Sequence, residues 1–103
     1  MINLKSKHLK LLQDIFSGYC PKAEIWAYGS RVNGDSHSGS DLDLVVKAFN
    51  DPHKTLAELR SLLIESNIPF LIDINVYEKL PVAFQKEILK NYIVIFPTTS
   101  IYS

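Results

Sequence analysis

The chain of 103 residues has a single cysteine and no excess of charge of either sign. Cys20 has no second cysteine to pair with, so an internal disulfide is excluded and a reducing compartment, the cytoplasm, is expected. Eleven basic residues balance eleven acidic residues, which gives a formal net charge of zero. Such a chain has no general field that attracts nucleic acid or an anionic membrane surface, so general nucleic-acid binding is not expected.

Long apolar stretches are also missing. No run approaches the roughly 20 apolar residues that a membrane-spanning helix needs, and no apolar segment follows Lys5 and Lys7 near the N-terminus. Neither export nor membrane insertion is therefore expected. Repeats, low-complexity runs and linkers are absent too, so we expect one domain over residues 1–103. Because it has no room for a second module, a partner is expected to help recognise the substrate.

The chain does contain an alternation of helical and strand-like patterns. Apolar residues recur at helical spacing from Leu4 to Tyr19, and strand-like segments cover residues 24–28, 41–46, 70–76 and 92–96. One helix is predicted to start at Asp51-Pro52, with the aspartate as N-cap, and another at Pro81. Strands separated by helices predict an α/β (α+β) fold in which helices connect the strands of a sheet.

Two carboxylates and a glycine-serine pair are the most informative residues. Asp41 and Asp43 are two positions apart in a predicted strand, so both side chains project to the same face. Like charges so close repel each other unless a cation lies between them, and carboxylate oxygens are ligands that Mg²⁺ prefers. Gly29-Ser30 follows the first predicted strand, where free backbone N–H groups point at any bound anion. Magnesium with a nucleoside triphosphate satisfies both features.

A third carboxylate, Asp73, interrupts the apolar segment 70–76. A buried, unpaired carboxylate costs several kcal/mol or becomes protonated, so a cation, a basic partner or a solvated cleft must lie near it. Taken alone, Asp73 fits an exposed strand end or a pair with a lysine. Beside the Asp41 and Asp43 pattern, it becomes a candidate for the same site.

The pattern Gly29-Ser30 followed by Asp41-x-Asp43 resembles the nucleotidyltransferase superfamily that includes DNA polymerase beta, the CCA-adding enzymes and the aminoglycoside nucleotidyltransferases. The fuller form, Gly29-Ser30-Arg31-x-x-Gly34-x5-Ser40-Asp41-Leu42-Asp43-Leu44, resembles the bacterial minimal nucleotidyltransferases (MNT), usually encoded beside a HEPN-domain partner. The resemblance covers most of the chain and implies their fold, a small mixed β-sheet of about four strands flanked by helices. It departs from the family at Lys90-Asn91, where a Glu-Gly pair is frequent.

The resemblance also implies roles for six residues. The expected catalytic and magnesium-binding residues are Asp41, Asp43 and Asp73, and the expected nucleotide-binding residues are Gly29, Ser30 and Arg31. Two magnesium ions and ATP as donor are expected, with Asp73 as the candidate general base. For Arg31, a surface arginine or a clamp on a carboxylate that shapes the loop is an equally good alternative.

The function expected first is Mg-dependent transfer of AMP from ATP to a hydroxyl, which the family implies is a tyrosine of a HEPN toxin silenced by this antitoxin. The alternatives are an antitoxin that acts by binding alone, with a vestigial nucleotide site, and an aminoglycoside-type enzyme that needs a partner subunit. The presence of Ser30 and the three aspartates favours the first, because binding alone requires none of them. The apolar run 93–96 predicts burial on both faces, by the chain's own helices or by another subunit, and a homo- or hetero-oligomer is expected.

Other conspicuous residues have simpler interpretations. Cys20 is predicted to fill apolar space, and Trp26 and Tyr28 are predicted to be core aromatics rather than a base-stacking platform. The three histidines, His8, His37 and His53, are predicted to be surface residues rather than metal ligands.

Overall fold

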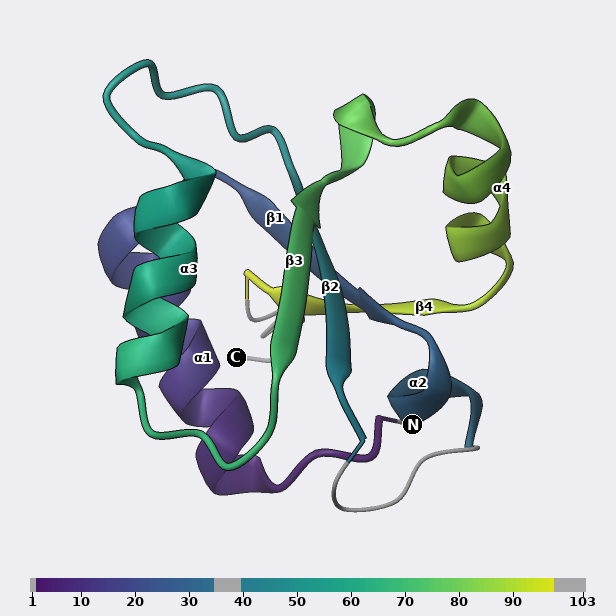
Figure 1. Cartoon of the computed structure of the whole chain (residues 1–103), viewed down its shortest axis with the longest axis horizontal. Coiled ribbons are helices and arrows are strands. Elements are labelled where there is room, and N and C mark those ends of the chain that lie inside the picture. Colours follow the sequence, from purple (N-terminus) through teal and green to yellow (C-terminus); the bar gives the residue numbers. More distant parts are fainter. Residues whose placement is uncertain (1, 35–39, 98–103) are drawn as a thin grey trace, which may run out of the picture.

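A four-stranded sheet forms the centre of the chain in a computed structural model that describes residues 2–34 and 40–97 (Figure 1). The strands are β1 (Glu24–Tyr28), β2 (Leu42–Lys47), β3 (Ile72–Val76) and β4 (Tyr92–Phe96). They lie in the order β3-β2-β1-β4; β1 is antiparallel to β2 and β4, whereas β2 and β3 are parallel. The prediction of a small mixed sheet of four strands is confirmed.

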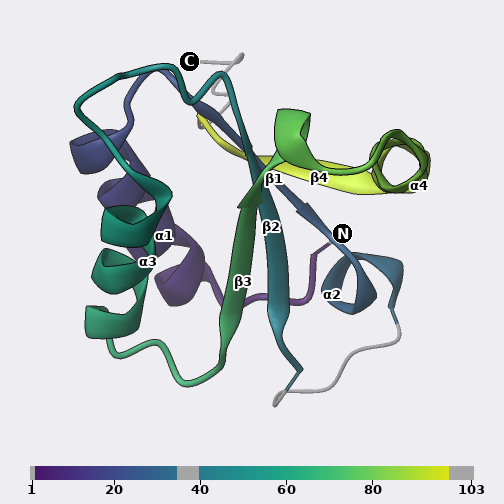
Figure 2. The same ribbon diagram turned by 45° about the horizontal axis from the view of Figure 1, so that its top comes forward.

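Helices cover the two faces of this sheet unequally. The long helices α1 (Ser6–Tyr19) and α3 (Leu56–Glu65) pack on one face, and α4 (Val82–Lys90) with the 3₁₀ turn η1 (Tyr77–Lys79) lies on the other (Figure 2). A single helical turn, α2 (Ser30–Asn33), follows β1 directly. The main core lies under α1 and α3 and includes Leu12, Phe16, Ile25, Leu44 and Ile74; a smaller cluster under α4 includes Trp26, Tyr28, Val45, Tyr77 and Ile88.

The predicted start of a helix at Asp51-Pro52 is wrong. Helix α3 begins at Leu56, and Thr55 is its N-cap, because Thr55 Oγ1 accepts a hydrogen bond from the backbone N–H of Glu58 at 3.1 Å. The Tyr19 hydroxyl fixes this cap from α1, accepting from the Thr55 N–H at 2.9 Å and donating to Glu58 Oε1 at 2.6 Å. A tertiary contact therefore helps to select the cap.

Asp51 instead forms a turn with the residues that follow it. Its Oδ1 accepts from the His53 N–H at 2.9 Å, and its backbone carbonyl accepts from the Lys54 N–H at 3.1 Å. In such turns the aspartate side chain accepts a hydrogen bond from the backbone N–H two residues later, and aspartate is equally common as a helix N-cap. The sequence signal for the turn is therefore the same as that for a helix start.

The simpler interpretations of Cys20, Trp26, Tyr28 and His53 agree with the structure, whereas His8 is less exposed than predicted. Cys20 is buried, and burial raises the pKa of its thiol to about 11. Trp26 and Tyr28 are buried in the smaller cluster. His53 is exposed, and half-buried His8 packs edge-on against Phe70; His37 lies outside the described residues.

Strand β4 is less enclosed than its sequence predicts. Ile95 and Phe96 are buried, but Tyr92 and Val94 are 37% and 38% exposed. Both side chains lie on the α4 face, because they pair with Tyr28 and Trp26 of the smaller cluster, and that face is only partly covered along β4. Burial on both faces is thus incomplete within the chain, and association with another chain stays a prediction. Across the described residues, no helix has the length and apolar character needed to cross a bilayer.

Candidate active site

Three polar side chains form a row across one face of the sheet. In the strand register, Tyr28 of β1 lies opposite Asp43 of β2, and Asp43 lies beside Asp73 of β3. Neighbours in register project to the same face, so these three side chains lie next to one another on the face that carries α4. Asp41 immediately precedes β2 and is two positions from Asp43. The structure therefore brings together all three aspartates that the sequence singled out.

The row carries uncompensated negative charge. Asp43 is half-buried, and burial raises its pKa, with further contributions from the charges of Asp73 and Asp41. Burial also raises the pKa of Tyr28 to about 12, reinforced by Asp43 and Asp73. Within the described part of the chain, the two ion pairs lie elsewhere, at Lys10–Asp14 and Lys90–Glu87. The site therefore favours a cation.

This repulsion predicts how stability depends on pH. Because the pKa of Asp43 in the folded chain lies above its ordinary value of 3.8, the folded chain binds more protons than the unfolded chain between these two values. Stability in chelator should therefore fall as the pH rises through this interval. Near neutral pH, Asp43→Asn should melt roughly 2–6 °C higher than the wild type, which corresponds to about 0.5–1 kcal/mol after solvent screening.

Thermal denaturation in chelator at several pH values measures this difference. The advantage of Asp43→Asn should shrink toward pH values below 3.8, where the wild-type carboxyl is protonated in both states. If the variant melts at or below the wild-type temperature near neutral pH, the three carboxylates do not repel one another in the folded chain.

Gly29 brings the backbone unusually close to this row. Gly29 directly follows β1, and its backbone has φ 82° and ψ −156°, a conformation that is almost restricted to glycine. A Cβ at this position would overlap Asp43 Oδ2 and lie 3.3 Å from Asp43 Cγ. The Gly29 carbonyl accepts from the N–H groups of Val32 and Asn33 and starts α2, so half-buried Ser30 is the first helical residue. The turn that carries the glycine-serine pair is thus directly adjacent to Asp43.

Arg31 faces away from the row and holds the surrounding chain together. Its side chain is 4% exposed; Nε and Nη2 donate to the carbonyl of Ser40 at 2.9 and 2.7 Å, and Nη1 donates to that of Asn3 at 2.7 Å. The guanidinium also stacks 4.2 Å from the ring centre of Phe70. Arg31 is therefore buried and not a surface residue, and within the described residues it clamps α2 against the residue preceding Asp41 through backbone carbonyls, whereas the sequence analysis considered a carboxylate.

A pocket of about 430 Å³ adjoins Gly29, between the β1–α2 turn and α4. Phe84 packs edge-on against Tyr28 with 5.8 Å between ring centres, and the Asn91 amide donates to Asn33 Oδ1. The lining residues are Tyr28, Gly29, Asn33, Phe84, Glu87, Ile88, Lys90 and Asn91. Aromatic and amide groups around a concave space suit a heterocyclic ligand. The sequence analysis did not identify this part of the pocket, because Asn33 and Asn91 are 58 positions apart.

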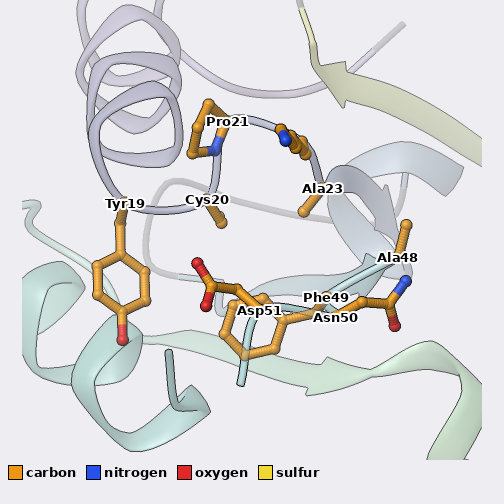
Figure 3. Close-up of a pocket in the computed structure, with 9 residues that line it drawn as sticks. Tyr19, Cys20, Pro21, Ala23, Ala48, Phe49, Asn50 and Asp51 are labelled. Carbon is orange, nitrogen blue, oxygen red and sulfur yellow. The ribbon is translucent and has the colours of Figure 1, made fainter. Parts of the chain in front are cut away.

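A second pocket, of about 420 Å³, lies at the other end of the same strands (Figure 3). It is formed by residues 19–23, which precede β1, and residues 48–51, which follow β2. Asp43 and Gly29 are at the opposite ends of those strands. This pocket is therefore separate from the acidic row.

The three aspartates fit a magnesium site by their chemistry. They offer carboxylate oxygens, the ligands of hard divalent cations, and the charge of Asp43 is coupled to both of the others. In residues 2–34 and 40–97, no three acidic, histidine or cysteine side chains already stand in metal-binding geometry. Mutual repulsion opposes such a gathering in the absence of a cation.

Comparison with known proteins decides the family. The sequence profile described as "Polymerase beta, Nucleotidyltransferase" matches residues 10–100. The chain belongs to this nucleotidyltransferase family. It is 32% identical over 96 residues to the "Probable protein adenylyltransferase MntA" of Haemophilus influenzae strain Rd, a match that covers 91% of this chain and 83% of that protein. The resemblance to the minimal nucleotidyltransferases is thereby confirmed, and the chain is an enzyme of the nucleotidyltransferase class.

A solved structure shares the fold of this nucleotidyltransferase. It is described as "Crystal structure of the toxin-antitoxin with AMP-PNP" and superposes with a TM-score of 0.70, covering 90% of this chain and 76% of that chain. The sequence identity is 20%, so this likeness concerns the fold.

Proposed function

We propose that this nucleotidyltransferase acts in the cytoplasm as an antitoxin, by transferring AMP from ATP to a tyrosine hydroxyl of a HEPN toxin with which it forms a complex. The observation that carries the proposal is the pair of Asp43 and Asp73 on neighbouring strands, with Asp43 packed against Gly29. The relative from Haemophilus influenzae, named a probable protein adenylyltransferase, supports the reaction. The toxin-antitoxin structure with AMP-PNP, an ATP analogue, supports the setting.

The three aspartates, the glycine-serine pair and Arg31 have different tasks in this proposal. Asp41, Asp43 and Asp73 would hold magnesium, two ions being proposed, and the metal would offset phosphate charge and lower the pKa of the attacking hydroxyl. Gly29 lets the backbone approach the phosphates, and Ser30 donates to a phosphate oxygen. Arg31 supports nucleotide binding from behind, because its clamp fixes α2 in place.

The transfer itself is a substitution at the α-phosphorus of ATP. The tyrosine oxygen forms a bond to this phosphorus, the bond to the oxygen that bridges to the β-phosphorus breaks, and pyrophosphate leaves. Asp73 accepts the proton of the hydroxyl as general base. The pocket beside Gly29 receives the adenosine, with Phe84 and the two linked amides of Asn33 and Asn91 against the base.

Labelled ATP tests this proposal. With magnesium and the HEPN partner, ATP labelled at the α-phosphate should label the partner, whereas ATP labelled at the γ-phosphate should not, because that phosphate leaves in pyrophosphate. The double variant Asp41→Ala/Asp43→Ala is the control and should transfer neither label. Label from the γ-phosphate would indicate a kinase, and a partner that is inhibited without either label would indicate an antitoxin that acts by binding alone.

A further inference from the structure

We propose that Asn75 positions the carboxylate of Asp73 in the acidic row, and that Arg60 holds the Asn75 amide in the orientation that this requires. The inference rests on the proposed function, in which Asp73 is the general base and a magnesium ligand. Asn75 and Arg60 are positioning residues in this account, because both act through Asp73 and neither has a proposed contact with ATP.

The half-buried side chain of Asn75 lies on the same face of the sheet as the acidic row. Asn75 follows Asp73 by two positions in β3, so both side chains project to the face that carries Asp43. Asn75 Nδ2 donates to Asp73 Oδ1 at 3.4 Å, which is a long contact for a hydrogen bond. This contact runs along the strand and uses one carboxylate oxygen, so it leaves the other oxygen of Asp73 for a metal ion or a proton.

Arg60 of α3 determines which end of the Asn75 amide faces Asp73. Its Nη2 donates to the backbone carbonyl of Ile74 at 2.9 Å and to Asn75 Oδ1 at 3.1 Å. A guanidinium has only donors, so it must face the amide oxygen of Asn75; a carboxylate has only acceptors, so Asp73 must face the amide nitrogen. Turning the amide over would therefore bring donor against donor at one end and acceptor against acceptor at the other. The bond to the Ile74 carbonyl anchors the guanidinium to the backbone of the same strand.

Asp73 requires such support because its surroundings favour other orientations of its side chain. It is exposed on an edge strand, and the neighbouring charge of Asp43 repels it. An exposed carboxylate without a partner samples several rotamers, whereas a general base must stay within hydrogen-bond reach of the proton that it accepts. The amide of Asn75 favours the orientation in which the carboxylate stays in line with β3, on the face that carries Asp43.

Kinetics of variants test the positioning role against a matched control. Asn75→Ala should lower kcat for AMP transfer about tenfold, at the low end of the effect of groups that orient a metal ligand, because its contact with Asp73 is long. Arg60→Ala should lower kcat about three- to tenfold. The KM for the HEPN partner should change less than about twofold in both variants, so that the loss falls on the chemical step. The control is Asn50→Ala, at an exposed asparagine beyond the opposite end of β2, and it should transfer AMP at the wild-type rate.

A double variant separates positioning from a merely structural role. On an Asp73→Asn background, Asn75→Ala should reduce the remaining transfer less than about twofold, because the group that Asn75 positions has already been removed. A further tenfold loss on that background would overturn the inference. Transfer by Asn75→Ala within about twofold of the wild type would overturn it too, and either result would leave the proposed function intact.

Nuclear magnetic resonance of the Asn75 side-chain amide tests the two contacts without any transfer. The amide resonances should shift in Asp73→Asn and in Arg60→Ala, and they should stay in place in Asn50→Ala. Resonances that respond to neither of the first two substitutions would overturn the inference. If the wild type transfers no AMP to its partner, the proposed function fails, and the resonances then decide by themselves whether Asn75 holds Asp73.

Discussion

Asp73→Asn is expected to lower the rate of AMP transfer about 10²–10⁴-fold, the usual contribution of a positioned general base. Asparagine has the same shape but cannot accept the proton of the attacking hydroxyl. Asp73 lies at the β3 end of the row, whereas Gly29 and Ser30 are at the β1 end. The affinity for ATP should therefore change less than about threefold, so that the loss falls on the chemical step.

Single-turnover transfer and the thermal shift with ATP and magnesium measure these two effects separately. Asp14→Asn is a matched control, because it removes an exposed carboxylate paired with Lys10 on α1. This control should transfer AMP at the wild-type rate. Two results would contradict the role of Asp73: transfer within about threefold of wild type, or a loss of ATP affinity that accounts for the whole decrease in rate.

Gly29→Ala is expected to destabilise the fold by about 2–4 kcal/mol and to abolish stabilisation by ATP with magnesium. The backbone of Gly29 adopts φ 82°, which strains any residue with a side chain, and the new methyl group would overlap Asp43 Oδ2. The carboxylate of Asp43 must then rotate out of the row. Chemical denaturation measures the first effect, and the thermal shift with ATP measures the second.

Substitutions at two other glycines distinguish backbone strain from the contact with Asp43 as causes of this destabilisation. Gly34 also has a positive φ, 88°, but a Cβ there meets no atom within 4 Å, so Gly34→Ala should show the strain alone, about 1–2 kcal/mol. Gly18→Ala faces neither strain nor a close atom and should be neutral or slightly stabilising. If Gly29→Ala costs no more than Gly34→Ala and still responds to ATP, the contact with Asp43 has no part in the site.

Most helices and strands were predictable because their signals are local, whereas the mixed four-stranded sheet was expected from the family resemblance. The segment Tyr92–Phe96 is a strand, as its apolar pattern indicates. Pro81 directly precedes α4, as is typical of a proline at the start of a helix. The start of α3 was not predictable, because Asp51 and Thr55 are both good caps and the Tyr19 hydroxyl from another helix favours Thr55. Selection between two local signals required a contact that only the folded chain contains.

In the candidate site, too, some features follow from local sequence signals and others only from contacts in the folded chain. Spacing within a strand predicted that Asp41 and Asp43 share a face, but the place of Asp73 beside Asp43 depends on the pairing of β2 with β3. The clamp formed by Arg31 depends on Asn3 and Ser40, which no local pattern connects. The charged residues can be identified from the sequence. The strand pairing that places them side by side, and the backbone groups that they contact, come from the tertiary structure.

The intact mass of the proposed HEPN partner tests the central claim most directly. After incubation with wild-type enzyme, ATP and magnesium, the partner should gain the mass of one or more AMP units, located on tyrosine. The variant Asp41→Ala/Asp43→Ala should leave the mass unchanged and the toxin active. A partner that remains unmodified, yet is inhibited equally by wild type and by this double variant, would contradict the enzymatic account.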